Sequence, residues 1–224
     1  MRLLLISSSN VHGYGYLDHA EPELRRILGR SVSFVPFALQ NHDAYTAKVR
    51  ERLAKMEIDV VQVRARAEIE SAEAIFIGGG NTFRLLKHLY DEDLMEPIRR
   101  RVRADGIPYI GSSAGTNVAT LSIKTTNDMP IVYPPSFDAL GLVPFQINPH
   151  YQDPDPNSTH KGETREERIR EFLEENDTPV VGLREGAMLR AEDEVVTLAG
   201  DKPARIFRRG AEPAELPPGS RIAF

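Results

Sequence analysis

The stretch Ile107-Pro-Tyr-Ile-Gly-Ser-Ser-Ala-Gly115 joins a short apolar run to a tight turn of small residues. It contains the pattern Gly-x-Ser-x-Gly, with Ser113 in the serine position, and a helical stretch follows it. In this arrangement a serine on a sharp strand-to-helix turn exposes its hydroxyl at the edge of a sheet, and the next backbone amide points to where an oxyanion would form. The stretch therefore predicts an α/β sheet and makes Ser113 a candidate nucleophile.

Apolar runs of strand length alternate with amphipathic stretches of helix length through the first half of the chain. The pattern predicts strands at 2–7, 31–37, 59–63, 74–77 and 107–110, and helices at 18–28, 43–56, 82–90 and 94–104. These strands are nearly continuous in apolar residues, as expected when helices cover both faces of a parallel sheet. We therefore expect a three-layer α/β/α fold with a mostly parallel sheet, formed by a single domain over residues 1–224.

The second half of the chain has a different pattern. Residues 121–161 are rich in Pro, Asn and Asp, and irregular chain of this length in a compact domain usually builds or covers a site. Beyond it, the sequence predicts a helix at about 163–175 and short strands near residues 180, 188, 195 and 205–208. We expect these short carboxyl-terminal strands to form hairpins rather than further strand–helix units.

Composition narrows the classes of protein and of chemistry. The 224 residues carry a formal net charge of -5 with both signs interspersed, which gives no indication of a nucleic-acid partner or an anionic membrane. The lack of cysteine excludes disulfides, thiolate metal sites and a cysteine nucleophile, and it agrees with a reducing cytoplasm. Because no apolar run reaches the length of a membrane span, we expect a cytoplasmic protein.

A second glycine-rich turn, Gly78-Gly-Gly-Asn81, directly follows the strand predicted at 74–77. Ligands of open α/β sheets gather at the carboxyl ends of the strands, where this turn and Ser113 both lie. A phosphate cradle is one interpretation, but the chain lacks the P-loop pattern and a complete dinucleotide-binding pattern. We favour an oxyanion hole, with one donor amide at Gly80 and the other at Ala114.

A serine nucleophile needs a base, and the chain offers six histidines. His150 follows the short apolar stretch 145–149, so it occupies a strand end from which it can reach Ser113, and position favours it over the others. The acid that would orient its imidazole stays open at this point, because Asp128 and Glu185 both fit. No metal is expected, since no set of residues has the spacing of a metal site.

Several segments agree with known motifs over runs too long for chance. They are 77–83 (Ile-Gly-Gly-Gly-Asn-Thr-Phe), 109–115, 125–132 (Thr-Thr-Asn-Asp-Met-Pro-Ile-Val), 134–142, 148–150 and 160–166 (His-Lys-Gly-Glu-Thr-Arg-Glu). Together they resemble the peptidase E, or α-aspartyl dipeptidase, family of serine peptidases, and the resemblance covers nearly the whole chain. It implies a glutamine-amidotransferase-like α/β fold and a reaction without a cofactor.

The resemblance also implies a catalytic triad. Ser113 would be the nucleophile, His150 the base, and Glu185 rather than Asp128 the acid. This order along the chain differs from that of α/β hydrolases, in which the acid precedes the histidine. The nucleophile turn would therefore lie on a different sheet topology.

The remaining site residues follow from the same resemblance. Arg165 matches the residue that binds the side chain of the substrate aspartate, and the amides of Gly80 and Ala114 again supply the oxyanion hole. We expect His160 and Asp128 to be further substrate-binding residues. The chain departs from some members of the family at Ser112, where those members carry an aromatic residue, so the resemblance carries over the chemistry but not the shape of the pocket there.

These observations predict a serine peptidase that hydrolyses dipeptides, and other short peptides, with an N-terminal L-aspartate. Its partners would be small peptides, with no nucleic acid and no membrane, and it would be a monomer or a homodimer. Two alternatives stay open. One is a cyanophycinase-like serine hydrolase acting on β-linked aspartyl polymers, and the other is a non-catalytic protein that binds a small molecule on a similar sheet.

Overall fold

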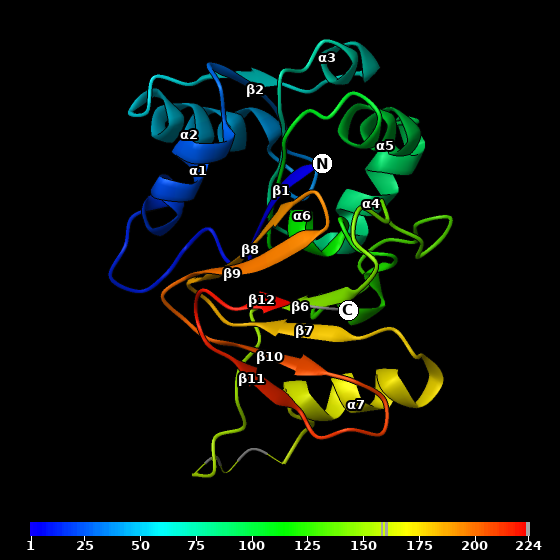
Figure 1. Cartoon of the computed structure of the whole chain (residues 1–224). Helices are drawn as coiled ribbons and strands as arrows, with labels where there is room; N and C mark the ends of the chain where they lie inside the picture. Colours follow the sequence, from blue (N-terminus) through cyan, green and yellow to red (C-terminus); the bar gives the residue numbers. More distant parts are fainter. Residues whose placement is uncertain (158, 160, 223–224) are drawn as a thin grey trace.

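The fold combines two β-sheets with helices packed against both of them (Figure 1). A computed structural model describes residues 1–157, 159 and 161–222. Within those residues, the larger sheet has eight strands in the order β12-β9-β8-β1-β5-β4-β2-β3, and the smaller sheet has four in the order β11-β10-β7-β6. The predicted α/β fold is confirmed, but the strands form two sheets rather than the single sheet that the sequence indicates.

The parallel part of the large sheet contains the five strands that the sequence predicts. They are β1 (Arg2–Ile6), β2 (Ser31–Val35), β3 (Asp59–Gln62), β4 (Ile75–Ile77) and β5 (Tyr109–Ser112). Ile6 of β1 pairs with Ser112 of β5, and Ile77 of β4 pairs with Gly111 of β5. The carboxyl ends of β1, β4 and β5 therefore lie side by side at one edge, where ligands of such sheets bind.

Helices cover both faces of these strands, which explains why the strands are apolar along their whole length. On one face lie the short 3-10 helix η1 (Asp18–Ala20), α1 (Glu21–Ile27) and α2 (His42–Ala54), and on the other lie α3 (Arg66–Glu70), α4 (Thr82–Asp91) and α5 (Met95–Arg103). Figure 1 shows these two groups on opposite sides of β1. In the described part of the chain, no helix combines the length and the apolar character needed to cross a membrane.

The large sheet is mixed rather than parallel throughout. The strands at its other edge are β8 (Ala187–Glu192), β9 (Val195–Gly200) and β12 (Arg221–Ile222). β8 pairs antiparallel with β1, β9 forms a hairpin with β8, and β12 pairs antiparallel with β9. The prediction of hairpins is confirmed for β8 and β9. The prediction of a mostly parallel sheet holds for the five strands from β1 to β3 in the sheet order and not for β8, β9 and β12.

The smaller sheet shows that the hairpin prediction is wrong for the strand near residue 180. This sheet contains β6 (Gln146–Pro149), β7 (Val180–Leu183), β10 (Ala204–Phe207) and β11 (Ala214–Leu216), with α7 (Arg165–Glu175) between β6 and β7. β6 and β7 pair in parallel, whereas β7, β10 and β11 pair antiparallel. Parallel neighbours need a crossover long enough to return the chain, and α7 belongs to that crossover, so β6, α7 and β7 form a further strand–helix–strand unit.

Ser7, directly after β1, connects the two sheets. Its hydroxyl donates to the carbonyl oxygen of Leu183 at 2.7 Å and accepts from the amide of His150 at 2.9 Å. The side chain of Ser7 is fully buried, so these bonds form away from water. The carboxyl ends of β6 and β7 therefore meet the carboxyl ends of β1 and β5, and residues from both sheets gather at this junction.

Candidate active site

Ser113 lies on a strained turn between β5 and α6 (Ala114–Asn117). Its backbone has φ 53° and ψ -108°, a region that residues with side chains rarely occupy. Its amide donates to the carbonyl oxygen of Ile6 at 3.0 Å, which anchors the turn to the end of β1. Strain of this kind persists only where surrounding contacts enforce it, and here it presents the Ser113 side chain at the carboxyl edge of the sheet.

The two glycines of the motif are required because backbone segments pass too close for any side chain. A Cβ atom on Gly115 would lie 2.0 Å from the carbonyl oxygen of Ile77, and a Cβ atom on Gly111 would lie 2.5 Å from the carbonyl oxygen of Gly115. The buried hydroxyl of Tyr109 donates to the same Gly115 oxygen at 2.6 Å. Close packing of the backbone therefore explains the Gly-x-Ser-x-Gly pattern.

His150 comes from the smaller sheet and contacts the serine directly. It follows β6 with a left-handed backbone, φ 55°, and Ser7 and the strand end hold its main chain. Its Nε2 atom lies 2.8 Å from Oγ of Ser113. The sequence placed His150 at a strand end near Ser113, and the structure brings the two together.

Glu185 completes a line of three polar side chains. It lies in the short connection from β7 to β8, and its Oε1 atom is 2.7 Å from Nδ1 of His150. Because a carboxylate only accepts hydrogen bonds, Nδ1 carries the proton and Nε2 is left to accept from the Ser113 hydroxyl. The side chains of His150 and Glu185 are 34% and 46% exposed, so solvent reaches this part of the line.

Asp128, the other candidate for the acid, has a different set of partners. Its Oδ2 atom accepts from the amide of Thr82 at 2.7 Å and from the Thr82 hydroxyl at 2.6 Å. Thr82 is the first residue of α4, so Asp128 satisfies one of the amides that a helix leaves unpaired at its start. The geometry thus pairs His150 with Glu185 and places Asp128 at the beginning of a helix.

The glycine-rich turn after β4 leaves one amide for a ligand. The amide of Gly78 donates to Val35, that of Gly79 donates to the hydroxyl of Tyr45 at 2.8 Å, and that of Asn81 donates to Ala38. Among the described residues, the amide of Gly80 has no acceptor.

The conformation of Gly80 explains why glycine occupies this position. Its φ is 137°, and a Cβ atom there would lie 2.6 Å from the carbonyl oxygen of Ala38. The second predicted donor, Ala114, is the first residue of α6, and its amide likewise has no acceptor within the part of the chain that the structure describes. Both predicted donors are therefore available for an oxyanion.

Two hollows open beside Ser113 and His150. One has a volume of about 310 Å³ and is lined by residues 8–10, Tyr16, Leu39, Tyr45, Lys48, Gly79, Gly80, Ser113 and His150. The other is a narrow space of about 20 Å³ lined by Thr82, Ser113, Ala114, Asn117, residues 126–128, Pro149 and His150. The pair of Ser113 and His150 lines both hollows, so a substrate whose scissile bond reaches Ser113 can extend to either side.

Arg165 lies at the first position of α7, half-buried beside a cavity of about 400 Å³ formed with residues 152–155. No ion pair or hydrogen bond of its guanidinium occurs within the described residues. Partial burial is the main cause that lowers the pKa of Arg165. Repulsion from Arg168 acts in the same direction, and attraction to the Asp128 carboxylate acts against it. The side chain is therefore not a solvated helix arginine paired with its neighbours.

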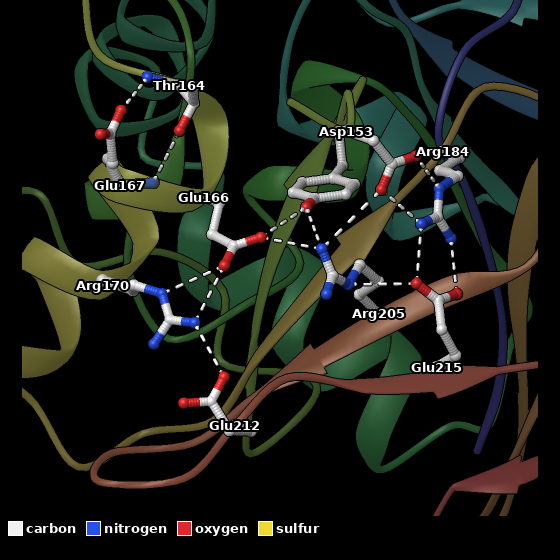
Figure 2. A network of polar contacts seen from close by, with 10 residues as sticks. Asp153, Thr164, Glu166, Glu167, Arg170, Arg184, Arg205, Glu212 and Glu215 are labelled. Carbon is white, nitrogen blue, oxygen red and sulfur yellow. Dashed lines mark hydrogen bonds and ion pairs between the residues drawn. The ribbon is translucent and has the colours of Figure 1, made fainter. Parts of the chain in front are cut away.

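The segments that carry His150 and Glu185 are joined by ion pairs, which Figure 2 shows. Arg184 forms two hydrogen bonds with Asp153, at 2.8 and 2.6 Å, and two with Glu215, at 3.0 and 2.9 Å. Arg205 contacts Glu166 at 2.8 Å and Glu215 at 3.0 Å. Hydrogen bonds donated by Arg184 lower the pKa of Asp153, and the same bonds to Asp153 and Glu215 raise the pKa of Arg184.

Sequence reasoning missed the residues that support the site. Ser7 and Tyr45 carry no motif of their own, and Thr82 lies in the motif at 77–83 without a role assigned to it, so only their contacts across the fold reveal them. His160, predicted to bind substrate, lies outside the described residues. Within the described part of the chain, no group of three or more His, Cys, Asp or Glu side chains is arranged to hold a metal ion.

Comparison with known proteins places the chain in a family. The model of peptidase family S51 matches residues 3–199. The chain is 58% identical to a Streptomyces coelicolor protein named peptidase E, covering 100% of this chain and 94% of the relative. It is 51% identical to a Drosophila melanogaster protein named probable α-aspartyl dipeptidase, covering 99% of this chain and 96% of the relative.

A solved structure supports the fold. The crystal structure of a peptidase from an acI-B1 actinobacterium superposes with a TM-score of 0.72 at 17% identity, covering 100% of this chain and 96% of that chain. The more specific likeness to glutamine amidotransferases stays a prediction. The match to the family model and the identity to full-length relatives lead to one conclusion: the chain belongs to peptidase family S51.

Proposed function

We propose that this protein is a serine peptidase that releases N-terminal L-aspartate from dipeptides and other short peptides. The observation that carries the proposal is the line of contacts from Ser113 through His150 to Glu185, at 2.8 and 2.7 Å. Membership of peptidase family S51 and identity to a protein named peptidase E support peptidase activity. The relative named as an α-aspartyl dipeptidase supports aspartate as the recognised residue.

In the first half of the reaction, the hydroxyl oxygen of Ser113 attacks the carbonyl carbon of the N-terminal residue, and Nε2 of His150 takes the hydroxyl proton. The carbonyl oxygen becomes an oxyanion that accepts hydrogen bonds from the amides of Gly80 and Ala114. Glu185 orients the imidazole and stabilises the imidazolium that forms. The peptide C–N bond then breaks, and the proton on Nε2 passes to the leaving nitrogen.

In the second half, water enters on the side that the leaving residue has vacated. Nε2 of His150 takes a proton from this water as its oxygen attacks the acyl carbon. The bond to Oγ of Ser113 then breaks, the proton returns to Oγ, and aspartate leaves with a free carboxyl group. The half-exposed position of His150 agrees with access of water to Nε2.

Recognition of aspartate is assigned to Arg165 and Asp128. A guanidinium binds a carboxylate through two parallel hydrogen bonds, and Arg165 has no carboxylate partner among the described residues. Asp128 uses its Oδ2 atom for Thr82, which leaves Oδ1 to accept from the α-ammonium group of the substrate. The helix α7, which begins at Arg165, contacts the 3-10 helix η2 (Ile123–Thr125), three residues before Asp128, and we infer that both side chains contact one N-terminal residue.

The test is hydrolysis of Asp-Leu by wild type and by Ser113→Ala. Loss of the nucleophile should lower kcat by on the order of 10⁶-fold. Ser112→Ala is the matched control, because its hydroxyl is buried in the same turn without a hydrogen-bond partner among the described residues. Asn-Leu, Glu-Leu and β-linked Asp-Leu complete the panel. Near-normal turnover by Ser113→Ala, or equal rates on all four dipeptides, would contradict the proposal.

Two further properties stay predictions. The cytoplasmic location follows from composition alone, and a monomer or a homodimer is expected. The size of the hollows beside Ser113 supports small peptides as substrates, since the larger one has about 310 Å³.

A further inference from the structure

The larger hollow beside Ser113 contains a lysine whose charge the mechanism above does not use. Lys48 lies on α2 and lines this hollow together with Ser113, His150 and Tyr45. Tyr45 precedes Lys48 by three residues, so the two side chains project from the same face of the helix. The hydroxyl oxygen of Tyr45 accepts from the amide of Gly79, which lines the same hollow.

Lys48 is an exposed residue that lines the hollow, and its ammonium group has no carboxylate partner among the described residues. Its Nζ atom lies 4.2 Å from the centre of the Tyr16 ring, an arrangement in which the ring attracts the cation and restricts the side chain. No ion pair of Lys48 occurs within the described residues, and no acidic residue is among those that line the hollow. Among the residues that line it, the hollow therefore offers an anion one positive charge and no competing negative charge.

The position of Arg165 and Asp128 indicates which end of the substrate enters this hollow. Asp128 lines the other, narrow space beside Ser113, and α7, which begins at Arg165, contacts the segment Ile123–Thr125 just before Asp128. If the N-terminal aspartate occupies that side, the leaving residue extends into the hollow that contains Lys48. In a dipeptide this residue carries the free α-carboxylate.

We propose that Lys48 binds the α-carboxylate of the leaving residue and thereby makes the enzyme selective for dipeptides. This assignment rests on the proposed function, since it needs the aspartyl residue on the side of Arg165. A dipeptide amide fills the same space but lacks the charge. A tripeptide places its carboxylate one residue further from Ser113, so the carboxylate no longer lies next to the Lys48 ammonium group.

The experiment compares Asp-Leu with Asp-Leu amide, using wild type, Lys48→Met and Lys48→Arg. We expect wild type to prefer the acid by about two- to fivefold in kcat/KM, because an exposed charge pair contributes modestly. Lys48→Met should lose this preference through a higher KM for the acid, with little change for the amide. Lys48→Arg should keep much of it. The matched control is Lys55→Met, directly after the same helix and outside the hollow.

The outcomes separate this assignment from the function on which it rests. A wild type that cleaves both compounds without preference, or a Lys48→Met variant that loses equally on both, would overturn the role of Lys48 and leave the peptidase proposal standing. A wild type that cleaves neither compound would overturn the proposed function and this assignment with it. Loss of the preference in Lys48→Met alone, with Lys55→Met unchanged, supports the assignment.

Discussion

The two sides of the catalytic line are held in place by different forces. On the Ser113 side, a backbone turn is enforced by contacts that leave no space for a side chain at Gly111 or Gly115. On the other side, His150 and Glu185 are 35 residues apart in sequence and meet because β6 and β7 pair in parallel. Ion pairs around Arg184, half-exposed at their carboxylates, join the segments that carry them (Figure 2).

This difference predicts two kinds of effect for substitutions in the site. The serine side is buried and local, so a substitution there disturbs the packing of β4, β5 and α6 before it disturbs any chemistry. The side with His150 and Glu185 is open to solvent and assembled from distant segments, so a polar substitution there can remove a catalytic group while the fold persists. Apart from loss of the Ser113 hydroxyl itself, changes on the first side should therefore appear in stability, and changes on the second should appear in kinetics.

After the loss of the Ser113 nucleophile itself, the largest expected effect is on the second side. Glu185→Gln removes the charge that orients and stabilises the His150 imidazolium, and kcat should fall by on the order of 10⁴-fold. Because Glu185 is half-exposed, the free energy of unfolding should change little. The measurements are kcat on Asp-Leu and urea unfolding of the same preparation.

Asp128→Asn serves as the comparison for this variant. It keeps an oxygen that can accept from Thr82 but loses the negative charge, so we expect KM for Asp-Leu to rise more than kcat falls. Equal losses of kcat in Glu185→Gln and Asp128→Asn would contradict the assignment of Glu185 as the acid. An Asp128→Asn variant that binds and cleaves Asp-Leu as wild type does would contradict a role for Asp128 in substrate recognition.

A smaller effect is expected for Arg165, which α7 of the smaller sheet carries. Arg165→Met should cost about 2–5 kcal/mol in kcat/KM on Asp-Leu, because the substrate carboxylate would be desolvated without a partner. The loss on Asn-Leu should be much smaller. Arg170→Met is a control on the same helix, since Arg170 pairs with Glu166 and Glu212 away from the cavity beside Arg165. A loss equal for both dipeptides would indicate general damage rather than lost recognition.

The same contrast explains how much of the site can be predicted from the sequence. The turn at Ser113 is set by neighbours in the chain, so its glycines and the apolar run before it reveal both the strand and the nucleophile. His150 could be ranked because it follows a short apolar run. Glu185 could not be separated from Asp128 by position, because Glu185 follows an apolar run, Asp128 lies in turn-like sequence, and only long-range pairing decides which one reaches His150.

The fold, like the site, has a part that the sequence predicts and a part that depends on long-range pairing. Alternating strands and helices predicted the five parallel strands, because each unit is local and repeats. The smaller sheet was missed because β6 and β7 are only four residues each, and the partner of a short strand depends on the rest of the chain. A signal was nonetheless present, since a helix between two apolar runs is the pattern of a parallel crossover.

On the serine side, Gly115→Ala tests whether the turn is held by sterics. The added Cβ would lie 2.0 Å from a backbone oxygen, a clash that no rotation of a side chain relieves. We expect a loss of about 3 kcal/mol in the free energy of unfolding, and a Tm lower by roughly 6–12 °C for a chain of this size. Gly29→Ala, where no atom lies within 4 Å, should change stability by less than about 0.5 kcal/mol. An unchanged Tm for Gly115→Ala, with lost activity, would remove the contrast between the two sides.

The smallest effect concerns the ion pairs near Glu185 and appears only as the pH changes. Hydrogen bonds from Arg184 lower the pKa of folded Asp153 below its ordinary value of 3.8, so the unfolded chain takes up the proton first as the pH falls. The stability that this pair contributes is therefore complete above pH 3.8 and is lost as the pH passes through the lower pKa of the folded state.

The difference in unfolding free energy between wild type and Asp153→Asn should be measurable at about pH 6 and should shrink towards about pH 3. Because Asp153 is 50% exposed, the difference should be small, and Asp177→Asn, in an 87% exposed pair with Arg209, should give none. A difference that is the same at both pH values would mean that packing rather than charge joins these segments, and the two sides of the site would then be held by the same kind of force.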